Sequence, residues 1–295
     1  MSNKPRKMTL EKKHNLTGWA FLAPATFLIA VFSFWPMIKA LVLSFQTGKG
    51  RNMQMAGFTN YIRMFQDDVF LQSIKNTFFY FILQVPIMLV VAMVLACILN
   101  KKDLRFKGFF RTMIFLPCTT SLVAYSIIFR SLFANDGLVN YVLVNLGILD
   151  KPYNFLTQPF AAKIVIILAL LWRWTGYNMV FFLSGLQNIE YSVYEAAKID
   201  GAGFWRTTFS VTLPMLKGTT DVLIILGIVG SLKTFDIVKL LTGGGPGRST
   251  TVMNTYLYEK AFKDFNAGGA ASIGVAILII AMVMSFLQVK FGKED

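Results

Sequence analysis

Long runs of apolar residues, almost free of charge, constrain the fold of this 295-residue chain more than any other feature. Six of them approach or exceed the ~20 residues that, at 1.5 Å of helical rise per residue, cross the ~30 Å hydrocarbon layer of a membrane. The expected spans are Gly18–Phe45, Thr77–Leu99, Met113–Phe133, Ile164–Leu186, Val222–Leu241 and Ala270–Val289. The sequence therefore predicts an all-α integral membrane protein with about six transmembrane helices.

Composition excludes several other classes of protein. Hydrophobic residues make up 55% of the chain and charged residues 15%, where a soluble domain carries about 25% charged residues. Many of the basic residues behind the net charge of +14 lie between apolar runs, whereas a nucleic-acid-binding protein gathers them on one soluble face. His14 is the only histidine, which excludes a metal site of the H-E-x-x-H type. We expect no nucleic-acid partner, no metal and no catalytic residue, and two reduced thiols at Cys97 and Cys118.

The basic residues also indicate how the chain is oriented. They are more frequent in the segments that are cytoplasmic when both termini lie inside, as is typical of membrane proteins. Residues 1–15 are expected to form a basic cytoplasmic tail that meets anionic lipid headgroups, and residues 16–295 the transmembrane domain. On the outer side we expect a short amphipathic helix over 57–75, turns within 134–160 and a flexible loop over 242–250.

The loop between the fourth and fifth spans, Glu190–Pro214, differs from the others. It begins with good helix formers around Glu195, and the Asp200-Gly201 pair then predicts a helix C-terminus, because glycine accepts the positive φ of a C-terminal cap. Pro214 suits the start of the next helix. Small residues around Gly201 permit close approach of another backbone. The segment is either an amphipathic helix that rests on lipid or a docking element for a cytoplasmic protein.

The same loop resembles a known family. Glu195-Ala196-Ala197, three residues, Gly201 and then Leu213-Pro214 are similar to the pattern E-A-A-x-x-x-G-(x)n-I-x-L-P of permeases from binding-protein-dependent ABC importers, with Val211 in place of the usual Ile. In that family the segment is the coupling helix, which docks into a groove on a cytoplasmic ATPase. The resemblance places this helix at about residues 190–210. It implies an ATPase-coupling role for Glu195, Ala196, Ala197, Asp200, Gly201 and Ala202.

The rest of the chain resembles the sugar branch of the family. The strings FLAPATFLIAVFSFWPMIKALVLSF, GFTNYIRMF, FRTMIFLPCTTSLVA and LLTGGGPGRST look like the first permease of maltose-, glycerol-phosphate- and multiple-sugar-type systems. The resemblance implies the type I ABC importer permease fold and a place in the bacterial cytoplasmic membrane. It also implies carbohydrate import, with an oligosaccharide favoured.

Several partners follow from this resemblance. They are a second homologous permease subunit, a dimer of cytoplasmic ABC ATPases and an extracellular solute-binding protein. ATP and Mg²⁺ then belong to the ATPase, and this chain holds no cofactor. The string GGGPGRST is not a nucleotide-binding loop, because Arg248 stands where that motif requires lysine and Pro246 interrupts it.

Polar and aromatic residues within the fourth and fifth spans are the candidates for the solute path, because leaving polar groups in lipid is costly and sugars need both hydrogen bonds and apolar faces. The candidates are Trp172, Trp174, Tyr177, Ser231, Lys233 and Thr234. In the maltose-type relatives the site lies on these same two helices, beside the third. Alternatively, the aromatic residues pack against neighbours, and Lys233 pairs with Asp236. Arg173 could bind an acidic solute, snorkel to the interface or line the contact with the partner.

Two other functions compete with sugar import. An importer of the same architecture could carry phosphate esters or polyols. A secondary carrier or channel acting alone is the other class, but carriers show inverted repeats and broken helices, and the six predicted spans show no repeat.

Overall fold

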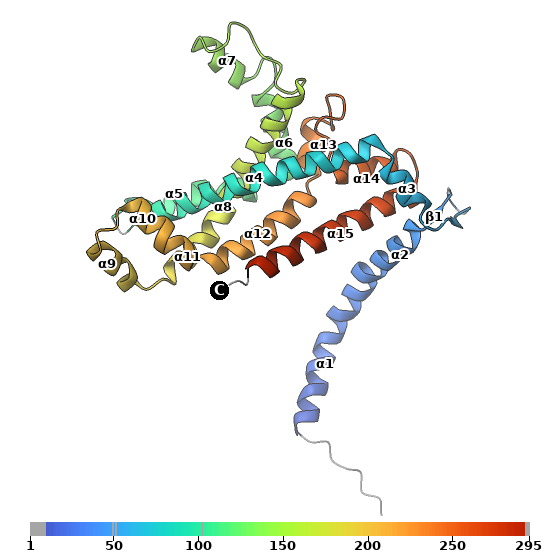
Figure 1. Ribbon diagram of the computed structural model, residues 1–295, viewed down its shortest axis with the longest axis horizontal. Helices are drawn as coiled ribbons and strands as arrows, with labels where there is room; N and C mark the ends of the chain where they lie inside the picture. The colour runs from blue at the N-terminus through green and yellow to red at the C-terminus, as the bar shows by residue number, and fades with distance from the viewer. Residues whose placement is uncertain (1–9, 49, 51, 102, 293–295) are drawn as a thin grey trace, which may run out of the picture.

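The computed structural model describes residues 10–48, 50, 52–101 and 103–292 and is almost entirely helical (Figure 1). Its helices and strands are α1 (Leu10–Ile29), η1 (Ala30–Phe34), α2 (Trp35–Ser44), β1 (Gln46–Thr47), β2 (Gln54–Met55), α3 (Thr59–Phe65), α4 (Asp68–Asn100), α5 (Lys107–Thr119), α6 (Leu122–Leu132), α7 (Leu138–Asn145), α8 (Pro159–Gln187), α9 (Tyr191–Ile199), α10 (Phe204–Thr207), η2 (Thr208–Thr212), α11 (Leu213–Met215), α12 (Lys217–Leu232), α13 (Asp236–Leu241), α14 (Met253–Phe262) and α15 (Ala267–Gly292). The strands β1 and β2 pair antiparallel.

Four of the predicted spans are continuous helices long and apolar enough to cross a membrane. They are Thr17–Ser44, which joins α1, η1 and α2, together with α4, α8 and α15. The prediction is confirmed for these four. The first helix begins at Leu10, inside the predicted tail, and residues 1–9 of that tail lie outside the described residues.

The predicted third span, Met113–Phe133, is not one helix. It consists of α5 and α6, which meet at an angle of 98°. Pro117 removes a backbone donor from the last turn of α5. The hydroxyls of Thr119 and Thr120 also bond back to the carbonyls of Leu116 and Pro117, at 2.8 and 2.7 Å, and so occupy acceptors that a continuing helix would use.

The predicted fifth span, Val222–Leu241, is broken as well. The helix α12 ends at Leu232 and α13 begins at Asp236, so the backbone over 233–235 is not helical. A carbonyl freed inside a membrane needs a partner, and the Asn254 side chain of α14 supplies one by donating to the Leu232 oxygen at 2.6 Å. Two of the six predicted spans are therefore not continuous helices, and the count of six is not confirmed.

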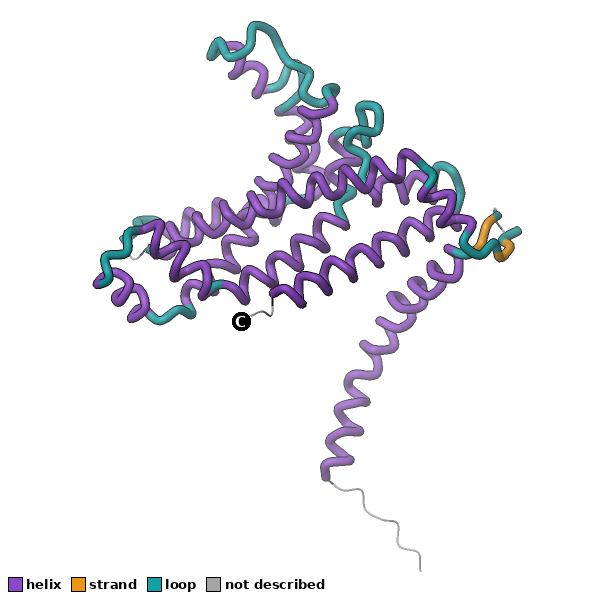
Figure 2. Tube along the Cα trace, viewed as in Figure 1, coloured by secondary structure: helices purple, strands orange, loops and turns teal. Residues whose placement is uncertain are grey.

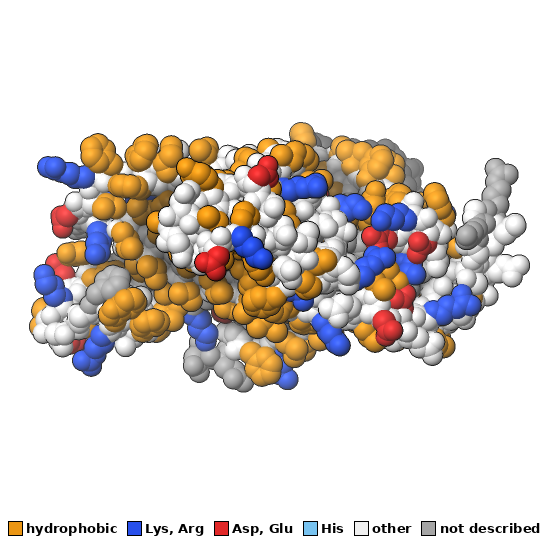
Figure 3. All heavy atoms as spheres, turned by 90° about the horizontal axis from the view of Figure 1, so that it is seen from above, with side chains coloured by type: hydrophobic (Ala, Val, Ile, Leu, Met, Phe, Trp, Pro, Cys, Tyr) orange, Lys and Arg blue, Asp and Glu red, His pale blue; other side chains and the backbone are white. Residues whose placement is uncertain are grey.

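The helices α4, α8, α12 and α15 run side by side and form the body of the molecule (Figures 1 and 2). The main apolar core lies between α4, α8 and α12. Its buried members include Met88, Ala92, Met179, Phe182 and Leu223. Apolar side chains also cover much of the surface seen in Figure 3, as expected for a protein whose solvent is lipid.

The first helix diverges from this body. In Figure 1, α1 points away from the other helices, while α2 leads back to the bundle. In the apolar 18-residue stretch of Thr17–Ser44, 0% of the residues are buried. The corresponding share is 44% for α4 and 50% for α8. Within the described part of the chain, nothing covers the apolar surface of α1.

The predicted amphipathic helix over 57–75 is divided between two elements. The helix α3 ends at Phe65, and the remaining residues open α4. The division occurs at Asp67, which has an extended backbone. The carboxylate of Asp67 caps α4 by accepting a hydrogen bond from the amide of Val69 at 3.0 Å.

Candidate functional site

The segment that follows α8 folds as its sequence predicts. The helix α9 ends in a glycine cap, with Gly201 at φ +72°. The Gly201 amide donates to the Lys198 oxygen at 3.1 Å and the Ala202 amide to the Ala197 oxygen at 2.9 Å. This is the double hydrogen bond of a Schellman motif. The cap fixes the direction in which the chain leaves α9.

This element lies at one end of the bundle, together with α10 and α11 (Figure 1); we call it the α9 end. Four of the six candidate coupling residues are exposed there, namely Glu195, Ala196, Asp200 and Gly201, and Ala202 is half-buried. Ala197 differs, since it is buried at 8% exposure. The small side chain of Ala197 therefore serves packing within the chain itself.

Large apolar side chains accompany these residues at the α9 end. Ile199 is 86% exposed and Trp205 62%. The ring of Trp205 stacks on that of Phe209 with centroids 6.1 Å apart. Exposed apolar groups beside small residues suit contact with another protein.

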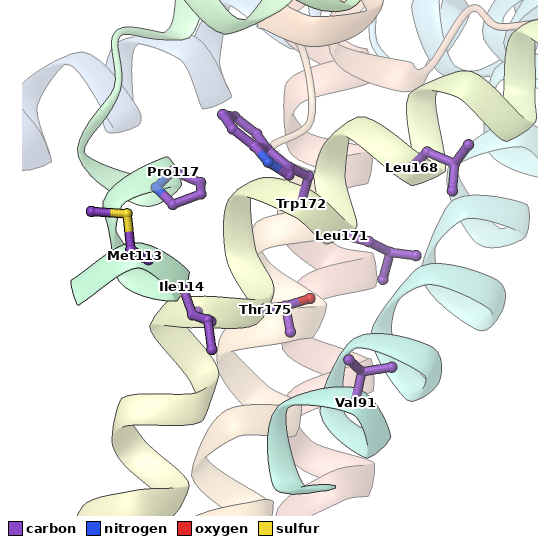
Figure 4. Close-up of a pocket in the computed structure, with 9 residues that line it drawn as sticks. Val91, Met113, Ile114, Pro117, Leu168, Leu171, Trp172 and Thr175 are labelled. Carbon is purple, nitrogen blue, oxygen red and sulfur yellow. The ribbon is translucent and has the colours of Figure 1, made fainter. Parts of the chain in front are cut away.

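A second feature is an open groove on the surface of the bundle, with a volume of about 490 Å³ (Figure 4). It lies where α5 crosses α8. Its lining residues are Val91, Met113, Ile114, Pro117, Leu168, Leu171, Trp172, Thr175 and Gly176. The lining is mostly apolar, with the Thr175 hydroxyl and the Trp172 indole as its polar side-chain groups.

Gly176 sets how closely α5 and α8 approach. A Cβ atom at this position would lie 1.9 Å from the backbone oxygen of Ile114 and 3.0 Å from the Cα of Phe115. Only a residue without a side chain fits there, as at the close helix crossings common in membrane proteins. The groove thus depends on this glycine.

Of the six predicted solute-path residues, only Trp172 lines this groove. It is 42% exposed and its ring centroid lies 5.5 Å from that of Phe129. Trp174 instead packs against the two main apolar clusters. Tyr177 lies between the rings of Trp174 and Phe181, at 5.9 and 5.0 Å.

The other three candidates lie together at the break between α12 and α13. Ser231 is buried and its hydroxyl has no hydrogen-bond partner. The buried Thr234 bonds to the Gly230 oxygen at 3.3 Å. Lys233 is exposed, and it forms no ion pair with Asp236, although both residues are described. The structure therefore does not support the alternative in which Lys233 pairs with Asp236.

Sequence reasoning missed Thr175 and Gly176, and although the resemblance placed the site beside the third span, it named no residue of α5. A glycine in the middle of an apolar span is a weak signal for a close crossing, but it does not name the segment that crosses. Arg173 also behaves unlike a snorkelling residue, since it is buried at 6% exposure.

The end of the bundle opposite α9 carries acidic and basic groups close together, as Figure 3 shows on the right. Asp67 accepts from the Tyr256 hydroxyl, and Glu259 pairs with Arg248 and Lys263. Burial by itself raises the pKa of each carboxyl, but the hydrogen bonds from these partners outweigh it and hold both pKa values below their ordinary range. Both carboxylates are therefore ionised at neutral pH.

The loop over 242–250, predicted as flexible, is instead a hydrogen-bonded turn at this end. The hydroxyls of Thr242 and Thr250 lie 2.7 Å apart, and Thr250 and Thr251 are buried. The Asn76 side chain of α4 donates to the Thr251 oxygen at 2.8 Å. Threonine hydroxyls form hydrogen bonds with the backbone polar groups of the turn. The glycine-rich composition of the loop did not indicate these bonds.

These observations define a class of protein, a multi-pass helical membrane protein with a capped helix exposed at one end and an open groove where α5 crosses α8. Residues 67–293 match the family described as "Binding-protein-dependent transport system inner membrane component". The chain belongs to this family.

Relatives with known names agree over nearly the whole length. The chain is 45% identical to the lactose transport system permease protein LacF of Rhizobium radiobacter, covering 98% of each chain. It is 35% identical to the multiple sugar-binding transport system permease protein MsmF of Streptococcus mutans, covering 97% of this chain and 99% of that one.

The fold has a counterpart among solved structures. A chain in the crystal structure of a bacterial alginate ABC transporter, in complex with an alginate pentasaccharide-bound periplasmic protein, superposes with a TM-score of 0.84. The match covers 95% of each chain at 25% identity. The structure thus has the fold of an ABC importer permease.

Proposed function

We propose that this chain is one permease subunit of an ATP-driven importer of carbohydrate, with an oligosaccharide as the favoured solute. The observation that carries the proposal is the capped α9 element with Glu195 and Gly201 exposed, in a chain of the binding-protein-dependent family. A separate ATPase can push on such an element. The lactose, multiple-sugar and alginate systems of its relatives favour a sugar.

The proposal includes an assembly. A dimer of cytoplasmic ABC ATPases, which binds ATP and Mg²⁺, docks at the α9 end, so this end faces the cytoplasm and both termini lie inside. A second permease subunit completes the path, and the uncovered apolar length of α1 supports such a neighbour. A solute-binding protein delivers the sugar at the opposite end. The membrane is the bacterial cytoplasmic membrane.

Within this assembly the groove is half of the solute path. Sugar rings present C–H faces that pack on aromatic rings and hydroxyls that need hydrogen bonds. Trp172 and Thr175 supply one group of each kind. The unpartnered hydroxyl of Ser231 and the exposed Lys233 support a second contact point at the α12–α13 break.

Reconstitution tests the function. The chain is co-purified with its second permease and ATPase, placed in liposomes and supplied with its binding protein. We expect ATP-dependent uptake of labelled lactose or a longer oligosaccharide. Uptake of glycerol 3-phosphate alone would change the assignment to a non-sugar importer. This is the second candidate function, because one relative is named for sn-glycerol-3-phosphate transport. Uptake by this chain alone, without ATP, would establish a stand-alone carrier instead.

Replacement of Trp172 by alanine is expected to lower kcat/KM for sugar uptake about tenfold, equivalent to ~1.4 kcal/mol, because the indole face is lost from the groove. Trp172→Phe is the matched control, since it keeps a ring at the same place and should retain most of the activity. Uptake is measured at saturating ATP. Unchanged kinetics in an assembled alanine variant would remove Trp172 from the path.

A further inference from the structure

The guanidinium group of Arg173 occupies an unusual place for a charge. It lies near the middle of α8 and is buried. No carboxylate among the residues that the structure describes forms an ion pair with it. A charge inside a membrane protein is costly unless something compensates it, and its position is then functional by default.

Backbone and aromatic groups provide the compensation. The Nη1 atom of Arg173 donates to the backbone oxygen of Thr120 at 2.7 Å and lies 3.2 Å from the Thr120 hydroxyl. Thr120 is the C-cap of α5, where the helix dipole places partial negative charge. The guanidinium carbon lies 4.8 Å from the ring centre of Tyr125 and 5.4 Å from that of Trp174, which are favourable cation–π distances.

These contacts touch both arms of the broken span. Thr120 closes α5, while Tyr125 belongs to α6. A single side chain from α8 therefore connects the two helices at the point where they turn by 98°. The Arg173 neighbours Trp172 and Thr175 line the groove, and so does Pro117 at the end of α5.

We infer that Arg173 is a positioning residue that holds the break between α5 and α6 and, through it, the wall of the groove. By satisfying the Thr120 carbonyl, it replaces the hydrogen bond that the broken helix has lost. Its stacking on the Tyr125 ring holds α6, while the Trp174 ring of α8 flanks the guanidinium group. The part of this inference that concerns solute rests on the proposed function, whereas the part that concerns the bend does not.

Lysine is a poor substitute in this environment. The planar guanidinium donates in a fixed direction while it stacks on rings, and an ammonium group does neither in the same way. The Nε atom of Arg173 is buried without a hydrogen-bond partner, so the connection to α5 and α6 depends on the Nη1 bond to Thr120 and on the Tyr125 ring. We expect Arg173→Lys to weaken the connection and Arg173→Met to remove it.

Spin labels on the two arms test the bend directly. Phe109 on α5 and Ile127 on α6 are both exposed and are changed to cysteine in a Cys97→Ser, Cys118→Ser background. In the purified complex, pulsed electron paramagnetic resonance should give a narrow distance distribution. In Arg173→Met it should broaden and move toward the ~27 Å that 18 residues of continuous helix span. Arg130→Met, a change of an exposed arginine on α6, is the control and should leave the distribution unchanged.

Transport kinetics separate the two parts of the inference. We expect Arg173→Met to raise the KM for solute at least tenfold, with the basal ATPase rate retained. An unchanged distance distribution overturns the positioning role, whatever the kinetics show. A changed distribution with normal KM keeps the role but removes the groove from the solute path. If the methionine variant does not assemble, Arg173→Lys is measured instead, and a distribution equal to that of the unmodified chain overturns the inference.

Discussion

Replacement of Gly176 by alanine is expected to reduce sugar uptake at least tenfold and to lower the thermal midpoint of the purified complex by several degrees. The added methyl group would meet the Ile114 backbone oxygen at 1.9 Å, and a backbone atom cannot rotate away as a side-chain end can. Overpacking of this kind typically costs ~1–3 kcal/mol. The helix α5 must shift as a whole, which changes the groove that it lines.

Gly230→Ala is the matched control for this prediction. Gly230 also lies within an apolar helix, but among the described residues no atom beyond its own stretch of helix comes within 4 Å of the Cβ it would gain. Uptake and thermal denaturation are measured for both variants. Equal effects at the two positions would show that loss of glycine flexibility, and not the crossing of α5 and α8, explains the result.

Replacement of Gly201 by tryptophan is expected to abolish solute-stimulated ATP hydrolysis while the complex still assembles. Two effects combine. A residue with a side chain is strained at φ +72° by ~1–3 kcal/mol, and the indole would stand on the exposed surface beside Glu195 and Ala196. The ATPase could then no longer approach the α9 end closely.

Two further variants separate strain from bulk. Asparagine tolerates a positive φ, so Gly201→Asn should keep most of the coupling. Gly147→Trp introduces the same bulk at a comparable φ of +69°, in the segment between α7 and α8 that our orientation places outside, and should leave basal ATP hydrolysis unchanged. Normal stimulation in Gly201→Trp would contradict the docking role of α9.

The sequence predicts those parts of the structure that depend only on residues near one another in the chain. The long, mostly apolar runs of α4, α8 and α15 become helices because lipid leaves their backbone no other partners. The cap at Gly201 follows from the chemistry of one residue. The capped helix α9 could therefore be predicted from residues within a single loop.

The breaks could not be predicted from the sequence, because local groups such as Pro117 act together with side chains that are distant in sequence. Pro117 alone does not end a membrane helix, since neighbouring groups often restore the lost hydrogen bonds. The bend persists with the support of Arg173, 53 residues away, and the second break with that of Asn254, 22 residues from Leu232. The groove depends likewise on the close approach of Gly176 to the backbone of α5 at Ile114, which is distant in sequence.

The two breaks share an order that bears on how the chain is made. In each case the stabilising side chain, Arg173 or Asn254, is synthesised after the carbonyl that it satisfies. As the ribosome delivers the third and fifth apolar segments, neither can yet complete its hydrogen bonds. Each of these two segments can complete its hydrogen bonds only after a later segment has been synthesised. Until then it remains in the translocation machinery or forms a transient straight helix. We therefore expect the hydrogen bonds that complete the two breaks to form only after α8 and α14, respectively, have been synthesised.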